Sequence, residues 1–270
     1  MKRLALATAV FALAGCGAAG VPKSAHQERA VSTPVTHASD STHPSASASP
    51  APPSATASAA ASASARPVGA PRHQSVIIAG DSIPEDLGPM ITRTLDGPLF
   101  SGHTESHPIT GLVRDDYYDW PAQTAKIAAE HPDTVIMMIG GNDNQPMKPQ
   151  GSAAYAQPAT PAWDAEYARR AGLVMDALRN GGVHRVYWLT LPTTDIPSMN
   201  GAVSAMGQAI RTAAKSRPSV TVYDTDVLLG GNAGTPIAHQ PDGIHLSTLG
   251  SQMISNALIG RLRIDGGSAA

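Results

Sequence analysis

Residues 134–143 read Thr-Val-Ile-Met-Met-Ile-Gly-Gly-Asn-Asp, an unbroken apolar run that stops at two glycines. A continuous run of this length, without alternating polar residues, is typical of a strand buried on both faces of a parallel sheet. The same pattern occurs upstream, where residues 75–79 run into Gly80. Further strands are predicted at 183–191 and 220–223, and residues 99–109 are compatible with a short strand.

Helical segments separate these strands. They are predicted at residues 83–95, 121–130, 161–180, 199–215 and 246–262. Gly181-Gly182 is a typical helix end, and Ser247 is a candidate N-cap of the last helix. Alternating strands and helices predict an α/β domain with three layers, α/β/α, around a central parallel sheet of about five strands. Ligands bind such sheets at the carboxyl ends of the strands, so we expect the chemistry there.

The composition separates the folded part from the N-terminal part. Residues 1–72 hold six Lys/Arg and two Asp/Glu, whereas residues 73–270 hold thirteen and nineteen. The acidic folded part argues against a nucleic-acid partner, which calls for a basic patch. The single cysteine, Cys16, excludes an intrachain disulfide. No apolar run reaches the ~18 residues of a transmembrane helix.

The first 15 residues predict a lipoprotein signal peptide. Lys2 and Arg3 precede the apolar stretch 4–13, and Leu13-Ala14-Gly15-Cys16 resembles the bacterial lipobox. Cys16 is then the lipidation site, and the protein is an extracytoplasmic lipoprotein held at the membrane only through its N-terminal anchor. The alternative is an ordinary signal peptide cleaved at an Ala-x-Ala site, Ala12-Leu13-Ala14.

Residues 16–72 predict a disordered tether that follows the lipidated cysteine. From 24 to 65 the chain is almost entirely Ser, Ala, Pro and Thr, with Val31 and Val35 as its only larger aliphatic residues. Such a segment cannot bury enough apolar surface to offset its ordering entropy. The domain organisation is therefore a signal peptide (1–15), a tether (16–72) and one folded domain (73–270).

Four short blocks follow in order along the folded part. They are Gly80-Asp81-Ser82, Thr110-Gly111-Leu112, Gly140-Gly141-Asn142-Asp143 and Asp242-Gly243-Ile244-His245. Two of them come directly after the strongest strands, where a parallel sheet places its ligands. Each block alone arises often by chance, but all four in this order rarely occur together by chance.

Together the four blocks resemble the SGNH (GDSL-like) hydrolase family, across nearly the whole folded part. The similarity is greatest to a bacterial extracytoplasmic branch, in which the second block runs into an Asp-Trp-Pro segment, here Asp119-Trp120-Pro121. The resemblance implies a flavodoxin-like sheet and hydrolysis of acyl esters, with no cofactor and no metal. It departs from the family name at Ile83, where the motif has leucine.

The residue types themselves suit acyl transfer. Ser82 stands where a strand turns into a helix, and a serine hydroxyl needs a base to become nucleophilic. His245 is the candidate base, since imidazole titrates near neutral pH. Asp242, three residues earlier, can accept from the other ring nitrogen and fix the tautomer. Asp81 and Asp143 are predicted to hold turns through hydrogen bonds to backbone.

The resemblance also implies an oxyanion hole. Its donors would be the backbone N–H groups of Ser82 and Gly111 and the side-chain amide of Asn142. Glycine allows the backbone to approach a substrate closely, and asparagine supplies a neutral NH₂ donor.

Other residues carry weaker signals. His103 and His107 are four apart and could ligate a metal, but surface-loop histidines are the expected alternative. Tyr117, Tyr118 and Trp120 could form an acyl or sugar platform, or could pack at the start of the next helix. Residues 140–143 are too short for a phosphate loop or a dinucleotide fingerprint, so no cofactor is expected.

The sequence therefore predicts an extracytoplasmic serine esterase acting on short-chain acyl esters. One alternative keeps the site but passes the acyl group to cell-wall or exported glycans, as an O-acyltransferase. The other is a non-catalytic lipoprotein that binds a glycan or a protein partner.

Overall fold

The structure is a computed structural model of the chain, and it describes residues 73–95 and 97–267. The predicted signal peptide, the lipidation site Cys16 and the tether to residue 72 lie outside these residues. Within the described ranges, no helix combines the length and apolar character required to cross a bilayer.

Five parallel strands form one sheet in the order β2-β1-β3-β4-β5. Their bounds are β1 Gln74–Gly80, β2 Phe100–Ser106, β3 Thr134–Met138, β4 Val186–Leu189 and β5 Val220–Tyr223. This is the flavodoxin-like strand order, in which the chain leaves β1 toward β2 on one side and reaches β3 on the other. The predicted parallel sheet of about five strands is confirmed.

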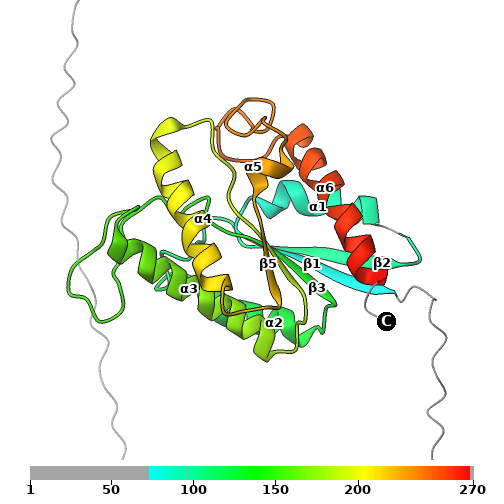
Figure 1. Cartoon of the computed structure of the whole chain (residues 1–270), viewed down its shortest axis with the longest axis horizontal. Helices are drawn as coiled ribbons and strands as arrows, with labels where there is room; N and C mark the ends of the chain where they lie inside the picture. The colour runs from blue at the N-terminus through cyan, green and yellow to red at the C-terminus, as the bar shows by residue number, and fades with distance from the viewer. Residues whose placement is uncertain (1–72, 96, 268–270) are drawn as a thin grey trace, which may run out of the picture. The chain divides into compact units, whose positions relative to one another are not determined.

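Helices cover both faces of the sheet (Figure 1). The helices are α1 Pro84–Leu95, α2 Trp120–Ala129, α3 Pro161–Asn180, α4 Asn200–Ala214, α5 Thr225–Leu228 and α6 Thr248–Gly267. One core lies between the sheet and α2, α3 and α4, and the other lies between the sheet and α1, α5 and α6. Neighbouring residues of β3 enter opposite cores, because successive side chains of a strand point to opposite faces. The strand is therefore buried throughout, which explains its unbroken apolar sequence.

Local signals account for the helix ends. Asp119 caps α2 by accepting from the Ala122 N–H at 2.9 Å, and Ser247 Oγ accepts from the Gly250 N–H at 2.9 Å at the start of α6. At the end of α3, the Gly181 N–H donates to Ala177 O and Gly182 takes a φ of 93°. The predicted cap of α6 and the glycine end of α3 are therefore confirmed.

The short helix α5 was not predicted, and α6 continues to Gly267, beyond the expected end at 262. Two strands also differ from the sequence prediction. The fourth strand covers only Val186–Leu189 of the expected 183–191, since Val183 and Leu191 are buried but stand outside the ladder. Conversely, β2 is a full seven-residue strand although its sequence is polar. It lies at the edge of the sheet and pairs with β1. This hydrogen bonding holds it as a strand, so it does not need apolar side chains on both faces.

Candidate active site

The carboxyl ends of β1 and β3 lie side by side, because Gly80 pairs with Met138 in the parallel ladder. The chain leaves β1 into Asp81 and Ser82, and it leaves β3 into residues 139–143. A side chain on Gly80 would place its Cβ 1.8 Å from the Met138 carbonyl oxygen, so only glycine fits there. Two of the predicted blocks therefore meet at the point where the chain turns to opposite sides of the sheet, the usual ligand site of this topology.

Ser82, His245 and Asp242 form one hydrogen-bonded series. Ser82 Oγ lies 2.8 Å from His245 Nε2, and His245 Nδ1 lies 2.6 Å from Asp242 Oδ2. Ser82 and His245 are separated by 163 residues of sequence, so only the fold brings them together. The arrangement is that of a hydroxyl whose proton can pass to an imidazole oriented by a carboxylate.

Asp242 is held as an acceptor by its own loop. Its Oδ1 accepts from the backbone N–H groups of Ile244 at 2.9 Å and His245 at 3.0 Å. Desolvation works to raise the pKa of Asp242, but these two bonds and the His245 ring outweigh it and leave the pKa below its usual value. Asp242 is therefore ionised and accepts a hydrogen bond from the Nδ1–H of His245, which holds the ring with Nε2 toward Ser82.

A second carboxylate approaches the base from α1. Gln240 Nε2 donates to Asp86 Oδ2 at 3.0 Å and to Leu246 O at 3.1 Å, and the Gln240 N–H donates to His245 O at 2.8 Å. Burial raises the pKa of the half-buried Asp86, and the proximity of His245 opposes that shift. Gln240 thus connects the loop of His245 with α1, the helix that begins beside Ser82. The sequence analysis missed both residues, since neither belongs to a block.

The oxyanion donors predicted from the resemblance lie on neighbouring loops. Asn142 Nδ2 donates to the carbonyl of Thr110, the residue before Gly111, at 2.9 Å. That bond uses one amide hydrogen and leaves the second for a substrate. Within residues 73–95 and 97–267, the backbone N–H groups of Ser82 and Gly111 donate no hydrogen bond.

Asp81 ties the first block to the third. Its Oδ2 accepts from the N–H groups of Gly140 and Gly141, both at 2.8 Å, and its Oδ1 accepts from Ile83 at 3.1 Å. Burial raises the pKa of Asp81, and the three backbone bonds oppose the shift. The predicted role of Asp81 in holding a turn through backbone hydrogen bonds is confirmed. Two of its three partners, Gly140 and Gly141, lie on the loop after β3.

Asp143 ties the third block to the second. Its two oxygens accept from the N–H groups of Leu112 and Val113, each at 3.0 Å, and Tyr167 Oη donates to Oδ2 at 2.9 Å. Burial raises the pKa of Asp143 to about 6, against the opposing effect of these bonds. A Cβ on Gly111 would stand 2.0 Å from Asp143 Oδ1, so this close approach requires glycine.

His103 lies away from the triad, whereas the His107 N–H donates to the Gly80 carbonyl at 2.9 Å, two residues before Ser82. His103 Nε2 lies 3.6 Å from Glu105 and 3.5 Å from Glu130, and these three are the candidate cation ligands of the described residues. His103 pairs with Ile77, three positions before the end of β1, so this group lies deeper along the sheet than Ser82.

The three aromatic residues do not share a role. Trp120 is fully buried in the core, and the half-buried Tyr118 packs its ring against Trp120 and His107. Tyr117 is 60% exposed. Packing at the entry of α2 therefore accounts for Tyr118 and Trp120, and no common platform exists.

A family model described as a protein of unknown function, DUF459, matches residues 75–261. No curated protein matches the sequence. Among solved structures, a lipase/acylhydrolase from Enterococcus faecalis is 15% identical, with 71% of this chain and 96% of that chain covered and a TM-score of 0.51. A catalytic mutant of an acetylxylan esterase from Geobacillus stearothermophilus has the same identity and TM-score over 71% and 94%.

An α/β hydrolase enzyme from the metagenome of Lake Arreo is 18% identical over 70% of this chain and 94% of its own, with a TM-score of 0.51. At these identities the likeness shows the fold. The domain therefore has the α/β fold of the SGNH hydrolases, as its four blocks predict.

Proposed function

The chain belongs to the DUF459 family, whose function is unknown, and we propose that this member is a serine esterase acting on short-chain acyl esters. The observation that carries the proposal is the series from Ser82 through His245 to Asp242, with contacts of 2.8 and 2.6 Å. The neighbours named as a lipase/acylhydrolase and an acetylxylan esterase support an acyl ester as the substrate.

Acylation begins when Ser82 Oγ attacks the ester carbonyl and its proton moves to His245 Nε2. The carbonyl oxygen becomes an oxyanion, which the N–H groups of Ser82 and Gly111 and the free N–H of Asn142 stabilise. The intermediate then expels the alcohol, which leaves with the proton from His245, and the acyl group stays on Ser82. Asp242 favours the transient imidazolium because it is ionised beside Nδ1.

Deacylation repeats the sequence with water as the nucleophile. His245 removes a water proton, the hydroxide adds to the acyl carbon, and Ser82 Oγ departs with the proton. The products are the free acid and the original enzyme. A short acyl group fits the surroundings, because Ile83 and Leu246, which flank nucleophile and base, are fully buried and offer no surface to a long chain.

The same site suits a sugar hydroxyl as acceptor. The side chains of His245 and Asp242 are 33% and 46% exposed, so the base is accessible to an acceptor larger than water. The protein is then an O-acyltransferase acting on cell-wall or exported glycans. An added acceptor sugar would lower the yield of free acid and raise the yield of acylated sugar at the same rate of ester consumption.

We propose an extracytoplasmic, membrane-anchored location on the sequence alone. Lys2, Arg3, the apolar stretch 4–13 and Cys16 in Leu13-Ala14-Gly15-Cys16 support a lipoprotein precursor. The mass of the mature N-terminus tests this: we expect a lipidated Cys16. An unmodified N-terminus downstream of Cys16 would refute the anchor and leave the esterase proposal standing.

Ser82→Ala tests the proposed function directly. We expect the variant to fold, with an unchanged circular dichroism spectrum, and to hydrolyse p-nitrophenyl acetate at a rate at least about 10³-fold below wild type, since the nucleophile is gone. Ser204→Ala, on an exposed position of α4, is the matched control and should keep wild-type turnover. Equal turnover by Ser82→Ala and wild type would favour the non-catalytic alternative.

The pH dependence tests the base. Because only neutral imidazole can accept the Ser82 proton, kcat/KM should fall on acidification if His245 is the base. The acid limb should follow one proton and should disappear, with most of the rate, in His245→Ala. A chelator should leave turnover unchanged; loss that a divalent metal restores would point to metal-assisted hydrolysis.

A further inference from the structure

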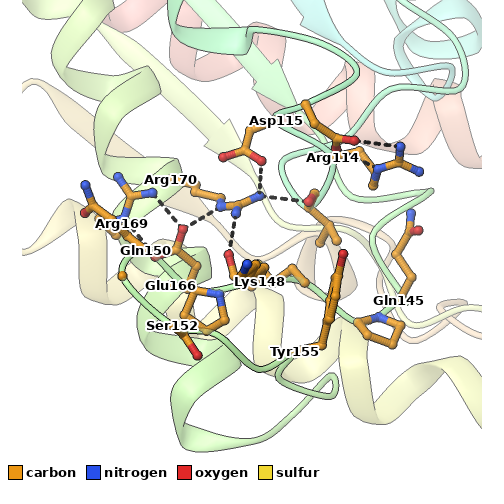
Figure 2. A pocket seen from close by; sticks show the side chains of 16 residues that line it. Arg114, Asp115, Gln145, Lys148, Gln150, Ser152, Tyr155, Glu166, Arg169 and Arg170 are labelled. Carbon is orange, nitrogen blue, oxygen red and sulfur yellow. Dashed lines mark hydrogen bonds and ion pairs between the residues drawn. The ribbon is translucent and has the colours of Figure 1, made fainter.

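A wide cleft of about 990 Å³ takes no part in the chemistry described above (Figure 2). Its walls come from residues 113–116, residues 145–152 with Tyr155, and the α3 side chains of Glu166, Arg169 and Arg170. This volume is at the upper end of the range of ligand pockets, about 300–1,000 Å³.

The cleft begins at the oxyanion loops. Gln145, in its wall, donates from Nε2 to the Asn142 carbonyl at 2.7 Å. Val113, in the opposite wall, is held through its N–H by Asp143, the residue after Asn142. The two loops that present Gly111 and Asn142 to a substrate therefore continue directly into the two walls, and a group bound in the cleft extends away from the ester bond.

The walls are fixed by one buried arginine. Arg170 donates from Nη1 to the carbonyls of Leu112 and Val113 at 2.9 and 2.8 Å, and from Nη2 to the carbonyl of Lys148 at 3.0 Å. Its Nε donates to Glu166 Oε1 at 2.7 Å. Arg170 thus joins both loops to α3, and the cleft exists before any ligand arrives.

The charges of the cleft are largely neutralised. Arg114 forms two bonds to Asp116, of 2.7 and 2.9 Å, and Arg169 forms two to Glu166, of 2.8 and 2.7 Å. Asp115 faces Arg170 at 3.1 Å. Lys148 is the cleft cation without an ion pair to any described residue. A strongly charged ligand would have to compete with these pairs, whereas a neutral ligand leaves them intact.

The cleft surface combines hydrogen-bonding groups with one open aromatic ring. Val113 and Met147 are buried and turn little apolar surface to the cleft, whereas Tyr155 is 69% exposed. Figure 2 shows Tyr155 standing in the wall between Gln145 and Lys148. Amide, ammonium and hydroxyl groups around an exposed ring match a sugar chain, whose hydroxyls accept hydrogen bonds and whose C–H faces pack on the negative face of an aromatic ring.

We propose that this cleft binds the alcohol part of the ester as a neutral oligosaccharide, with one sugar ring stacked on Tyr155. The inference rests on the proposed esterase function and adds the substrate class. The acetylated sugar lies at Ser82, and the following sugars run between residues 113–116 and 145–155. Lys148 and Gln145 donate to sugar hydroxyls. Among the described residues that line this cleft, only Pro146 and Pro149 besides Tyr155 bring accessible apolar side chains to it, which is too little for a lipid alcohol, and an anionic glycan would find one unpaired cation.

The test compares two kinds of substrate on the full chain. One is p-nitrophenyl acetate, which carries no sugar. The other is a panel of partially O-acetylated oligosaccharides of five or more sugars: neutral xylo-, cello-, manno- and chito-oligosaccharides, and anionic oligogalacturonides. We expect at least one neutral member to have a kcat/KM at least tenfold above that of p-nitrophenyl acetate.

Variants then locate the binding. Tyr155→Ala should lower kcat/KM for the preferred oligosaccharide about tenfold more than for p-nitrophenyl acetate, through KM, as expected for loss of an aromatic anchor. Tyr155→Phe should restore most of the difference, because the ring is kept. The matched control is Tyr117→Ala, an exposed tyrosine on the loop before α2 that does not line the cleft; it should equal wild type on both substrates.

Each failure has its own signature. If wild type does not hydrolyse p-nitrophenyl acetate or any oligosaccharide, the proposed esterase function fails. If p-nitrophenyl acetate is hydrolysed through Ser82 but no neutral oligosaccharide is preferred, or an anionic one is, the oligosaccharide inference is overturned. Equal effects of Tyr155→Ala on both substrates would also overturn it.

Discussion

The side-chain amide of Asn142 donates one N–H to the Thr110 carbonyl, and this bond aims the second N–H. If that second N–H stabilises the oxyanion, Asn142→Ala should lower kcat for p-nitrophenyl acetate by about 10²–10³ with little change in KM. Initial-rate kinetics measure the two constants separately. Asn144→Ala, on the exposed residue two positions later, is the matched control. A change confined to KM would mean that Asn142 positions the substrate.

Ile109 is strained. It has a φ of 65°, although its β-branched side chain disfavours that region, and the side chain is 74% exposed. The left-handed conformation costs about 1–2 kcal/mol for a residue with a Cβ. Ile109→Gly should therefore raise the free energy of unfolding by up to about 1 kcal/mol, less the greater entropy of glycine in the unfolded chain.

Urea denaturation measures the effect of Ile109→Gly. Ile237 is the matched control, because it is also exposed and has no positive φ. Ile237→Gly should destabilise the fold, since it brings the entropy cost without relieving strain. A clear loss of stability in Ile109→Gly would show that the Ile109 side chain makes contacts that outweigh its backbone strain.

At the scale of elements, the site depends on the contact between α1 and the loop that precedes α6. Gln240 makes this connection through Asp86 Oδ2 and the carbonyl of Leu246. Gln240→Ala should lower the free energy of unfolding by about 1–2 kcal/mol, because it removes two hydrogen bonds and leaves a half-buried carboxylate short of a donor. It should also lower kcat, because His245 loses its fixed position relative to Ser82.

Two further variants test whether the donor amide of Gln240, and not the size of its side chain, supports the site. Gln240→Glu has the same shape but places a second carboxyl group beside Asp86, so it should reduce kcat at least as much as alanine does at neutral pH. Gln252→Ala removes an exposed bond to Asn256 on α6 and should change neither stability nor kcat. Wild-type kcat in Gln240→Ala would show that the loop holds His245 without help from α1.

At the scale of the whole molecule, the loops at the carboxyl ends of the strands support both the candidate site and the cleft. The carboxyl ends of β1 and β3 present Ser82 and Asn142, and α3 holds the cleft loops through Glu166 and Arg170. Desolvation works to raise the pKa of Glu166. Bonds from Arg169, Arg170 and the Gln150 N–H outweigh it and lower the pKa to about 2. The ionised carboxylate therefore contributes to global stability.

This contribution depends on pH in a definite direction. A carboxyl group with a depressed folded pKa stabilises the protein above its unfolded pKa, and the stability is lost as the pH falls through the folded pKa. The Glu166 contribution should be complete above the usual value of 4.5 and should decline toward about 2. Urea midpoints at several acidic pH values should fall more steeply for wild type than for Glu166→Gln. Parallel curves would mean that the carboxylate adds nothing to stability.

The sequence by itself determined the sheet and the order of its functional blocks. Strands buried on both faces are continuously apolar. The apolar runs before Gly80 and Gly140 therefore predict strands without any knowledge of the strands that pair with them. Residues that follow such runs meet at one edge of a parallel sheet, which is why Ser82 and Asn142 could be predicted as neighbours. The polar edge strand β2 escaped a firm prediction, because its pairing partner, and not its own pattern, makes it a strand.

Only the tertiary structure decided the contacts between distant segments. The four blocks named Ser82 and His245 as partners, but their 2.8 Å approach is a property of the fold. The attachment of Asp143 to Leu112 of the second block and the Gln240 contact with Asp86 join residues 31 and 154 positions apart, and no sequence pattern indicated either contact. The cleft beside Tyr155 likewise depends on Arg170 reaching two loops from α3. Local propensity and periodicity act over a few residues, whereas these contacts follow from how the helices and loops pack on the finished sheet, so no local pattern could reveal them.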